Sequence, residues 1–129
     1  MKVSLITIFP EFFPGAFGDG MIRVAREKGR LDVDIVNLRD FTDDPHKTVD
    51  DAPFGGGPGM VMMAEPLAQA VQQAQAQREK PAKVLLFSPI GRVLDHAAVQ
   101  HWAASEGAIL VCGRYEGLDQ RFIDTCVDE

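Results

Sequence analysis

The segment Ala108–Gly117 reads AILVCGRYEG, and it does most to decide the fold. Its first five residues are apolar, and a short apolar run of this kind is typical of a buried strand. Gly113 and Gly117 follow at once, so the backbone can turn sharply and approach a ligand closely. An apolar helical pattern over Asp119–Val127 comes next. A strand that passes through a glycine turn into a helix is the repeating unit of an α/β sheet.

Further apolar runs indicate that this unit repeats along the chain. Two of these runs are as apolar as Ala108–Cys112. A third run alternates apolar and polar residues at its start, as a half-exposed strand does. These runs are Val3–Phe9 (VSLITIF), Ala82–Ser88 (AKVLLFS) and Leu31–Leu38 (LDVDIVNL). Helical patterns lie between them, over Met21–Lys28, over Glu65–Lys80 and after a capping Asp95. The alternation predicts a Rossmann-like parallel sheet flanked by helices on both faces.

The stretch Arg39–Gly59 has neither a helical nor a strand period. A loop of this length in a small domain is usually functional or mobile. Its run Gly55–Gly59 (GGGPG) is not a phosphate-binding P-loop, because Met60 follows where that motif needs Lys with Ser or Thr. His46, with Asp50 and Asp51, is a candidate metal or acid/base cluster. Local hydrogen bonding within a polar loop is the commoner explanation of such residues.

Length and charge limit the possible classes of protein. The chain has 129 residues, enough for one domain, and a formal net charge of −6. This acidic balance argues against a protein whose whole surface binds nucleic acid, but it leaves room for a local basic patch. Such a patch is formed in the sequence by Arg23, Arg26, Lys28 and Arg30, followed by Arg39, His46 and Lys47. A solvated helix face is the commoner reading of that run.

Several other classes find no support. The two cysteines and three histidines do not have zinc-finger spacing, and there is no Gly-x-Ser-x-Gly nucleophile elbow. Cys112 ends an apolar run, as a buried, reduced thiol would. No leader-like segment and no apolar run of the roughly 20 residues that a membrane span needs is present. We therefore expect a cytoplasmic protein without a membrane partner.

The ends of two predicted strands are the most distinctive places for a site. In open α/β sheets ligands bind beyond the carboxyl ends of the strands, which here lead into Phe87–Gly91 and Cys112–Gly117. Backbone N–H and C=O groups beside glycines are free to read a flat heterocycle such as adenine. Glu116 is placed to orient a hydroxyl, a cation or a substrate amine. From spacing alone, a tight turn without any ligand explains the glycines equally well.

Four segments together carry a resemblance to a known family. They are ITIFPEFF, RDFTDDPHKTVDDAPFGGGPGMVMM, FSPIGRVLD and LVCGRYEGLDQR, in this order. With these separations they resemble the bacterial tRNA (guanine-N1)-methyltransferases, over essentially the whole chain. The combination of TVDD-x-P-F-GGGPGM with CGRYEG-L-D is highly specific.

This resemblance implies a fold, an activity and partners. The family belongs to the knotted SPOUT class, in which the end of a Rossmann-like domain threads into a trefoil knot, a rare exception to unknotted topology. Its members transfer a methyl group from S-adenosyl-L-methionine to N1 of the guanosine 3′ of the anticodon in tRNA. They act as homodimers with sites built from both subunits, and magnesium is implied for catalysis.

The resemblance also implies site residues. Expected at the cofactor are Leu86, Phe87, Ser88 and Pro89 on one strand end, and Gly113, Tyr115, Glu116 and Gly117 on the other. Expected at the substrate are His46, Asp50, Gly55 and Gly57. Glu116 is cast as an auxiliary catalytic group, and no residue is assigned to a metal. Leu86, often aromatic in the family, and Ile90, often polar, are mild departures.

The end of the chain is the larger departure from the family pattern. Residues 1–129 correspond to the cofactor-binding α/β domain, and the family continues with a third cofactor loop that completes the knot, a catalytic aspartate and a tRNA-binding C-terminal domain. We therefore expect an incomplete knot, and a chain that is inactive alone. Two alternatives stay open, a non-catalytic α/β nucleotide-binding or interaction module and a knotted methyltransferase acting on ribose or ribosomal RNA. The GGGPGM segment argues against the latter.

Overall fold

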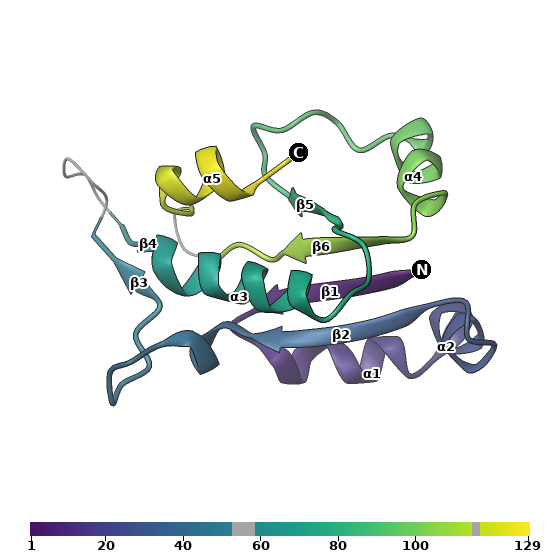
Figure 1. Cartoon of the computed structure of the whole chain (residues 1–129), viewed down its shortest axis with the longest axis horizontal. Helices are drawn as coiled ribbons and strands as arrows, with labels where there is room; N and C mark the ends of the chain where they lie inside the picture. The colour runs from purple at the N-terminus through teal and green to yellow at the C-terminus, as the bar shows by residue number, and fades with distance from the viewer. Residues whose placement is uncertain (53–58, 115–116) are drawn as a thin grey trace.

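The predicted apolar runs pair into one parallel sheet. The computed structural model describes residues 1–52, 59–114 and 117–129 (Figure 1). The strands are β1 (Lys2–Thr7), β2 (Asp32–Asn37), β5 (Lys83–Leu86) and β6 (Gly107–Val111). They lie in the order β2-β1-β6-β5, and every neighbouring pair is parallel. The predicted Rossmann-like arrangement is confirmed, with β1 and β6 at its centre.

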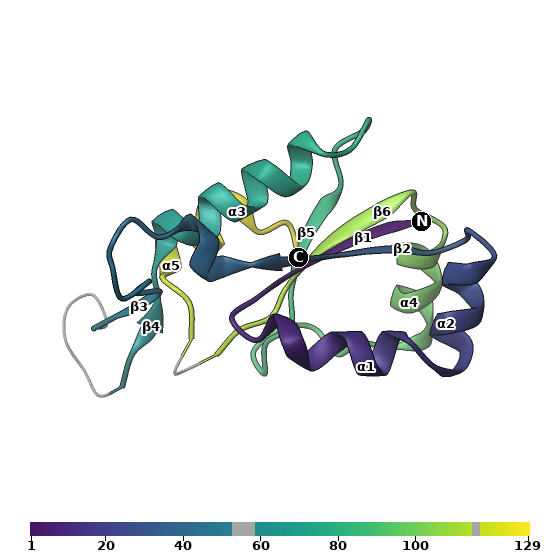
Figure 2. The ribbon, with the colours of Figure 1, turned by 90° about the horizontal axis from the view of Figure 1, so that it is seen from below.

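Helices cover both faces of the sheet, as expected, but unequally (Figure 2). On one face lie α3 (Ala64–Ala76) and α5 (Gln120–Cys126). On the other face lie α1 (Phe13–Phe17), α2 (Gly20–Glu27) and α4 (His96–Ala103). The main core forms on the α3 face, where Leu67 and Phe122 pack against Ile6 and Val111 of the central strands. α3 contributes five buried residues, whereas α1, α2 and α4 contribute none.

The stretch expected to lack regular structure contains two short elements. A 3-10 helix, η2 (Leu38–Phe41), follows β2, and β3 (Asp50–Asp51) pairs antiparallel with β4 (Val61–Met62). Another 3-10 helix, η1 (Pro10–Phe12), leads into α1. Two-residue strands carry no readable period, so pattern analysis misses them. They form because Val49 and Met62 are fully buried in the main core.

The last residues lie along the outer edge of β5. The Leu86 N–H donates to the Glu129 carbonyl at 2.9 Å, and the Glu129 N–H donates to the Val84 carbonyl at 3.2 Å. The Glu129 carboxylate accepts hydrogen bonds from Trp102 Nε1 at 3.0 Å and from Arg92 at 3.2 Å. The Trp102 bond lowers the pKa of Glu129. These contacts tie α4 and the segment after β5 to the sheet. None of the described helices is long and apolar enough to cross a membrane.

At the opposite end of the strands, Arg78 joins the end of α3 to the sheet. Its guanidinium donates to Ser4 Oγ at 2.7 Å, to the Lys2 carbonyl at 3.1 Å and to the Ala108 carbonyl at 3.4 Å. Burial lowers the pKa of Arg78, and the charges of Asp34 and Asp32 partly oppose that effect. Gly107 lies directly beside this clamp.

Gly107→Ala should destabilise the fold. A Cβ at Gly107 would lie 2.5 Å from the Lys2 carbonyl oxygen, which is backbone and cannot move aside, and it would also overlap the Arg78 guanidinium. Overpacking of this kind costs roughly 1–3 kcal/mol, measurable by urea unfolding. Gly15→Ala in α1, where nothing lies within 4 Å of the added carbon, is the matched control. That variant should be neutral or slightly stabilising; equal losses in both variants would contradict the account.

Candidate cofactor and substrate site

The register of β5 and β6 places the two predicted cofactor segments side by side. Leu86 pairs with Val111, the last residues of their strands, so Phe87 and Cys112 leave the sheet at the same level. Neighbouring strands lie about 4.8 Å apart, so one small ligand can touch both segments. A Cβ at Gly113 would lie 3.1 Å from Leu118 Cδ1 and 4.0 Å from Leu86 Cδ1. The absence of a side chain at Gly113 therefore lets Leu118 and Leu86 approach the backbone closely where the two loops begin.

The first cofactor segment, residues 86–89, turns outward at the end of β5. Phe87 is 51% exposed, although its aromatic side chain follows a buried strand. A turn follows, in which the Gly91 N–H donates to the Ser88 carbonyl at 3.1 Å and the Ile90 N–H donates to Ser88 Oγ at 3.4 Å. The backbone at Ser88 is thus fixed while the Phe87 ring faces outward.

The second cofactor segment is joined to β4. The Met62 N–H donates to the Gly117 carbonyl at 2.9 Å, and the Asp119 N–H donates to the Met62 carbonyl at 2.9 Å. Gly117 has φ +151°, a backbone conformation that residues with a Cβ rarely adopt. Tyr115 and Glu116 lie outside the described residues, so their predicted roles stay predictions. Asp119 caps α5 by accepting from the Arg121 N–H at 2.9 Å.

The substrate segment meets the cofactor segment through the same strand. Asp50 pairs with Met62, and Met62 pairs with Leu118, so three separate parts of the chain lie in neighbouring positions. The structure thus brings Asp50 close to the end of the loop that begins at Gly113. Gly55 and Gly57 lie outside the described residues.

His46 lies on an exposed turn of the same segment. The Asp44 carboxylate holds this turn by accepting from the Thr48 N–H at 2.8 Å and from the Thr48 hydroxyl. The hydrogen bond from the Thr48 side chain is the main cause of a lowered Asp44 pKa, with a small contribution from His46. No contact in the described structure joins His46 to Gly113 or Gly117. The predicted grouping of His46 with Asp50 rests on their common loop.

Two cavities border these segments. One of about 200 Å³ lies between the end of β1 and the start of the second cofactor segment. Its lining includes Phe9, Phe12 and Phe13 opposite Gly113, and Arg114 lies 5.7 Å from the centre of the Phe9 ring. The other, of about 440 Å³, lies between β3, β4 and the first turns of α3 and α5, and Asp51, Glu65 and Asp119 line it.

The sequence analysis did not assign Phe9, Phe12 or Phe13 to the site. They follow the carboxyl end of β1, a central strand. Because ligands bind beyond the carboxyl ends of strands in such sheets, this position could have predicted them as site residues. Cys112, predicted to be a buried thiol, is only half-buried, and this partial burial raises the pKa of its thiol. Within the described parts of the chain, no group of three or more His, Cys, Asp or Glu residues is placed to hold a metal ion.

Comparisons with known proteins match this geometry. A family model described as tRNA (Guanine-1)-methyltransferase TrmD matches residues 1–129. This chain belongs to that family. The curated tRNA (guanine-N(1)-)-methyltransferase of Albidiferax ferrireducens is 57% identical over 129 residues, and that of Photobacterium profundum is 50% identical over the same length. The chain spans about half the length of these relatives, 52% of each.

A solved structure shows the same fold. The crystal structure of the tRNA (m1G37) methyltransferase from Aquifex aeolicus superimposes with a TM-score of 0.90 at 33% sequence identity. The match covers 100% of this chain and 57% of that chain. The expected SPOUT-class assignment is confirmed: the described sheet and helices form part of a tRNA (guanine-1)-methyltransferase domain.

The Asp44–Thr48 contact predicts how the His46 turn responds to pH. Because hydrogen bonds to the ionised carboxylate lower the pKa of Asp44, the turn is stabilised above the ordinary value of 3.8 and loses this contribution as the pH falls through the lowered value. The Thr48 amide proton, followed by NMR, should titrate with a midpoint below 3.8. Thr48→Val, which removes the main cause, should raise that midpoint. A parent midpoint at or above the ordinary value would refute the assignment.

Proposed function

We propose that residues 1–129 form the cofactor-binding domain of an enzyme that methylates N1 of the guanosine 3′ of the anticodon in tRNA, with S-adenosyl-L-methionine as methyl donor. The observation that carries the proposal is the pairing of Leu86 with Val111, which sets Phe87–Pro89 beside the loop that begins at Gly113. The family match over the whole chain and the names of the relatives support it.

S-adenosyl-L-methionine supplies a sulfonium-bound methyl group that N1 of guanine attacks in line, so that the N–C bond forms as the S–C bond breaks and its electron pair stays on sulfur. The chain must hold the donor and remove the N1 proton. Backbone groups around Ser88 and Gly113 are suited to reading the adenine ring, because Gly113 leaves them uncovered. Glu116 is proposed as an auxiliary group beside the reacting atoms.

The substrate base must leave its stack before it can react. N1 lies on the pairing edge of guanine, so an enzyme reaches it only in an extruded or unpaired nucleotide. The segment with His46, Asp50, Gly55 and Gly57 is proposed to hold that nucleotide. The position of Asp50 next to Met62, and of Met62 next to Leu118, supports this role because it links the segment to the cofactor loop.

We further propose that the enzyme is a cytoplasmic homodimer. The face that carries α1, α2 and α4 buries no residue of these helices, and large apolar side chains are exposed on it, with Phe12 at 75% and Met21 at 80%. Exposed apolar patches of this kind mark association surfaces. A second copy of the chain is the occupant that we propose, because a family site built from two subunits needs one.

The paired loops predict a specific loss of cofactor affinity in Gly113→Val. The added side chain would fill the space toward Leu118 and Leu86, so S-adenosylhomocysteine should bind at least about tenfold more weakly by isothermal titration, or 1.4 kcal/mol. The titration uses the protein as its gene encodes it. Ala76→Val, a similar enlargement at an exposed position of α3, should leave the affinity unchanged.

Failure of the parent protein to bind S-adenosylhomocysteine would favour the non-catalytic binding module instead. Equal affinities for the parent and Gly113→Val would leave the family assignment intact but remove Gly113 from the cofactor site.

The apolar face predicts that Phe12→Asp combined with Met21→Asp weakens self-association. A charge at each position opposes burial against a second copy, while both side chains are already solvent-exposed in the single chain. Sedimentation should show a shift from dimer toward monomer with the fold retained. Gln72→Asp with Gln73→Asp on exposed positions of α3 is the matched control. An unchanged dimer in the first variant would place the interface elsewhere.

A further inference from the structure

The charges of the chain are unevenly divided between the two ends of the sheet. The amino ends of the strands, with the turns that enter them, form a surface made of residues 1–2, 23–32, 77–83 and 101–107, here called the amino edge. It holds eight of the thirteen Lys and Arg residues of the sequence but only four of the nineteen Asp and Glu residues. A chain whose net charge is −6 therefore carries a net positive charge along one edge.

The parts of the amino edge lie next to one another. The Met1 ammonium donates to the Arg30 carbonyl at 3.0 Å, and Lys2 Nζ donates to the Gln77 carbonyl at 2.9 Å. The Lys2 N–H also donates to the Glu106 carbonyl at 2.9 Å. Figure 1 shows the N-terminus, α2 and α4 at one end of the molecule and β3 and β4 at the other. The segments that carry these basic residues are thus in contact with one another at one end of the sheet.

Most of these cations have no carboxylate partner. Among the described residues, ion pairs on the amino edge join only Arg23 to Glu27, at 2.9 Å, and Lys80 to Glu106, at 3.2 Å. Lys2 and Arg26 donate to backbone carbonyls, contacts that leave their charge uncompensated. Arg78 donates to backbone carbonyls and to Ser4, and its charge is partly offset by Asp34 and Asp32. Lys28 and Arg30 are exposed and take part in none of the described ion pairs. Lys83 is also exposed and forms none of these ion pairs, but its charge is near enough to the Glu129 carboxylate to help lower the pKa of that group.

Helix termini offer a simpler explanation for the charges, but they are too weak to account for all of them. α2, α3 and α4 end at this edge, and each C-terminus carries about half a negative elementary charge, which nearby cations stabilise. Three such termini therefore offset between one and two positive charges. Within the residues of the amino edge the excess of cations over carboxylates is four. The Glu129 carboxylate, which accepts from Trp102 Nε1 at 3.0 Å, reduces this excess by one. A positive potential remains, and it is available to an anionic partner.

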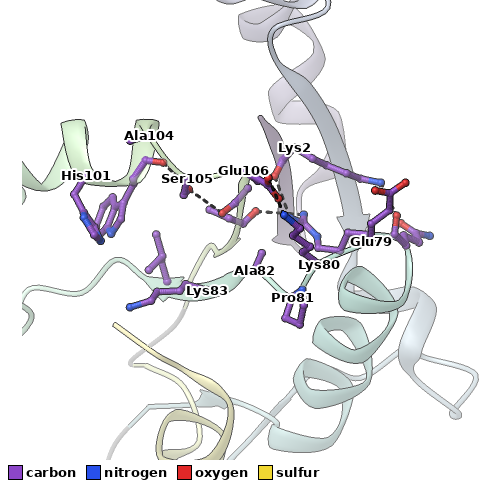
Figure 3. Close-up of a pocket in the computed structure, with 16 residues that line it drawn as sticks. Lys2, Glu79, Lys80, Pro81, Ala82, Lys83, His101, Ala104, Ser105 and Glu106 are labelled. Atoms are coloured by element: carbon purple, nitrogen blue, oxygen red, sulfur yellow. Dashed lines mark hydrogen bonds and ion pairs between the residues drawn. The ribbon is translucent and has the colours of Figure 1, made fainter.

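The same edge contains the largest cavity described, with a volume of about 730 Å³ (Figure 3). Its lining includes the basic residues Lys2, Lys80 and Lys83, the rings of His101 and Trp102, and the carboxylates of Glu79 and Glu106. In Figure 3, Lys83 and His101 lie near each other, and the Lys80 side chain lies beside Glu106. A cavity that combines ammonium groups with an indole and an imidazole ring suits a phosphate-bearing chain with bases, which uses both charge and stacking.

We propose that the amino edge is a second RNA-binding surface, which holds the phosphate backbone of the tRNA away from the site of methyl transfer. This inference rests on the proposed function, since it takes the tRNA substrate as given. Phosphate contacts fix the position of a nucleic acid without reading its sequence. Fifteen of the nineteen Asp and Glu residues lie outside the amino edge, so the amino edge supplies an attraction that the rest of the chain does not.

The test is the salt dependence of tRNA binding in Arg30→Gln combined with Lys83→Gln. Both side chains are exposed and donate no described hydrogen bond, so the fold should be retained. Each lost phosphate contact lowers the slope of log affinity against log salt by about 0.7–0.9, so the slope should fall by roughly 1.5 in all. Affinity for an unmodified tRNA transcript should fall about three- to tenfold at low salt. The control, Gln72→Glu with Gln73→Glu, makes the same change in net charge on α3.

The outcomes separate this proposal from the proposed function. S-adenosylhomocysteine affinity should be the same in the parent, the double variant and the control. If the parent binds tRNA and the double variant keeps its slope and affinity, the amino-edge proposal is wrong while the methyltransferase proposal stands. If the control loses as much as the double variant, net charge and not the amino edge is responsible, which also overturns the proposal. A parent that binds the cofactor but not tRNA would overturn both.

Discussion

The parallel pairing of β6 with β1 on one side and β5 on the other is the constraint on which the rest of the structure depends. On the face of the sheet that α3 covers, the two inner strands contribute Ile6, Ile109 and Val111 to the core. The burial of these side chains fixes the register of the strands. A shift by one residue would turn these side chains to the opposite face. Because all four strands run in one direction, every carboxyl end lies at one edge and every amino end at the other. The molecule therefore has two edges of different character.

The carboxyl ends of the strands carry the two loops that were predicted from the sequence to bind the cofactor, which follow Leu86 and Val111. Their geometry follows directly from the register of β5 and β6. Because Leu86 pairs with Val111, the next residues, Phe87 and Cys112, leave the sheet side by side. Gly113 has no side chain between Leu118 and Leu86, and Met62 joins the next part of that loop to β4. The amino edge is built differently, from Arg78 bound to backbone carbonyls and from exposed lysines. With strands of four to six residues at ~3.3 Å each, the two edges are roughly 13–20 Å apart, a distance that a tRNA can span.

The fold was predictable from sequence where side-chain patterns were long enough to read. The predicted run Ala82–Ser88 contains β5, and Val3–Phe9 and Ala108–Cys112 cover β1 and β6 except for their first residues, Lys2 and Gly107. The helix predicted at Glu65–Lys80 covers all of α3 except Ala64, but α3 itself ends earlier, at Ala76. β3 and β4 were not predicted, because they are held by burial of Val49 and Met62 and by pairing across the sequence, which no local pattern records. The site was predictable in part. The strand order brings Leu86 beside the loop that begins at Gly113, and Met62 joins Asp50 to Leu118, but the roles of these residues stay predictions. The phenylalanines beside Gly113 were missed because they follow a different strand.

The most direct test of this account is to incubate the protein, as its gene encodes it, with S-adenosyl-L-methionine and an unmodified tRNA transcript, and to map the methyl group by mass spectrometry of the digested RNA. The account predicts one product, N1-methylguanosine at the position 3′ of the anticodon, and no product when that guanosine is replaced by adenosine. Methylation of a ribose, methylation at another nucleotide, or no transfer by a protein that binds S-adenosylhomocysteine would contradict it.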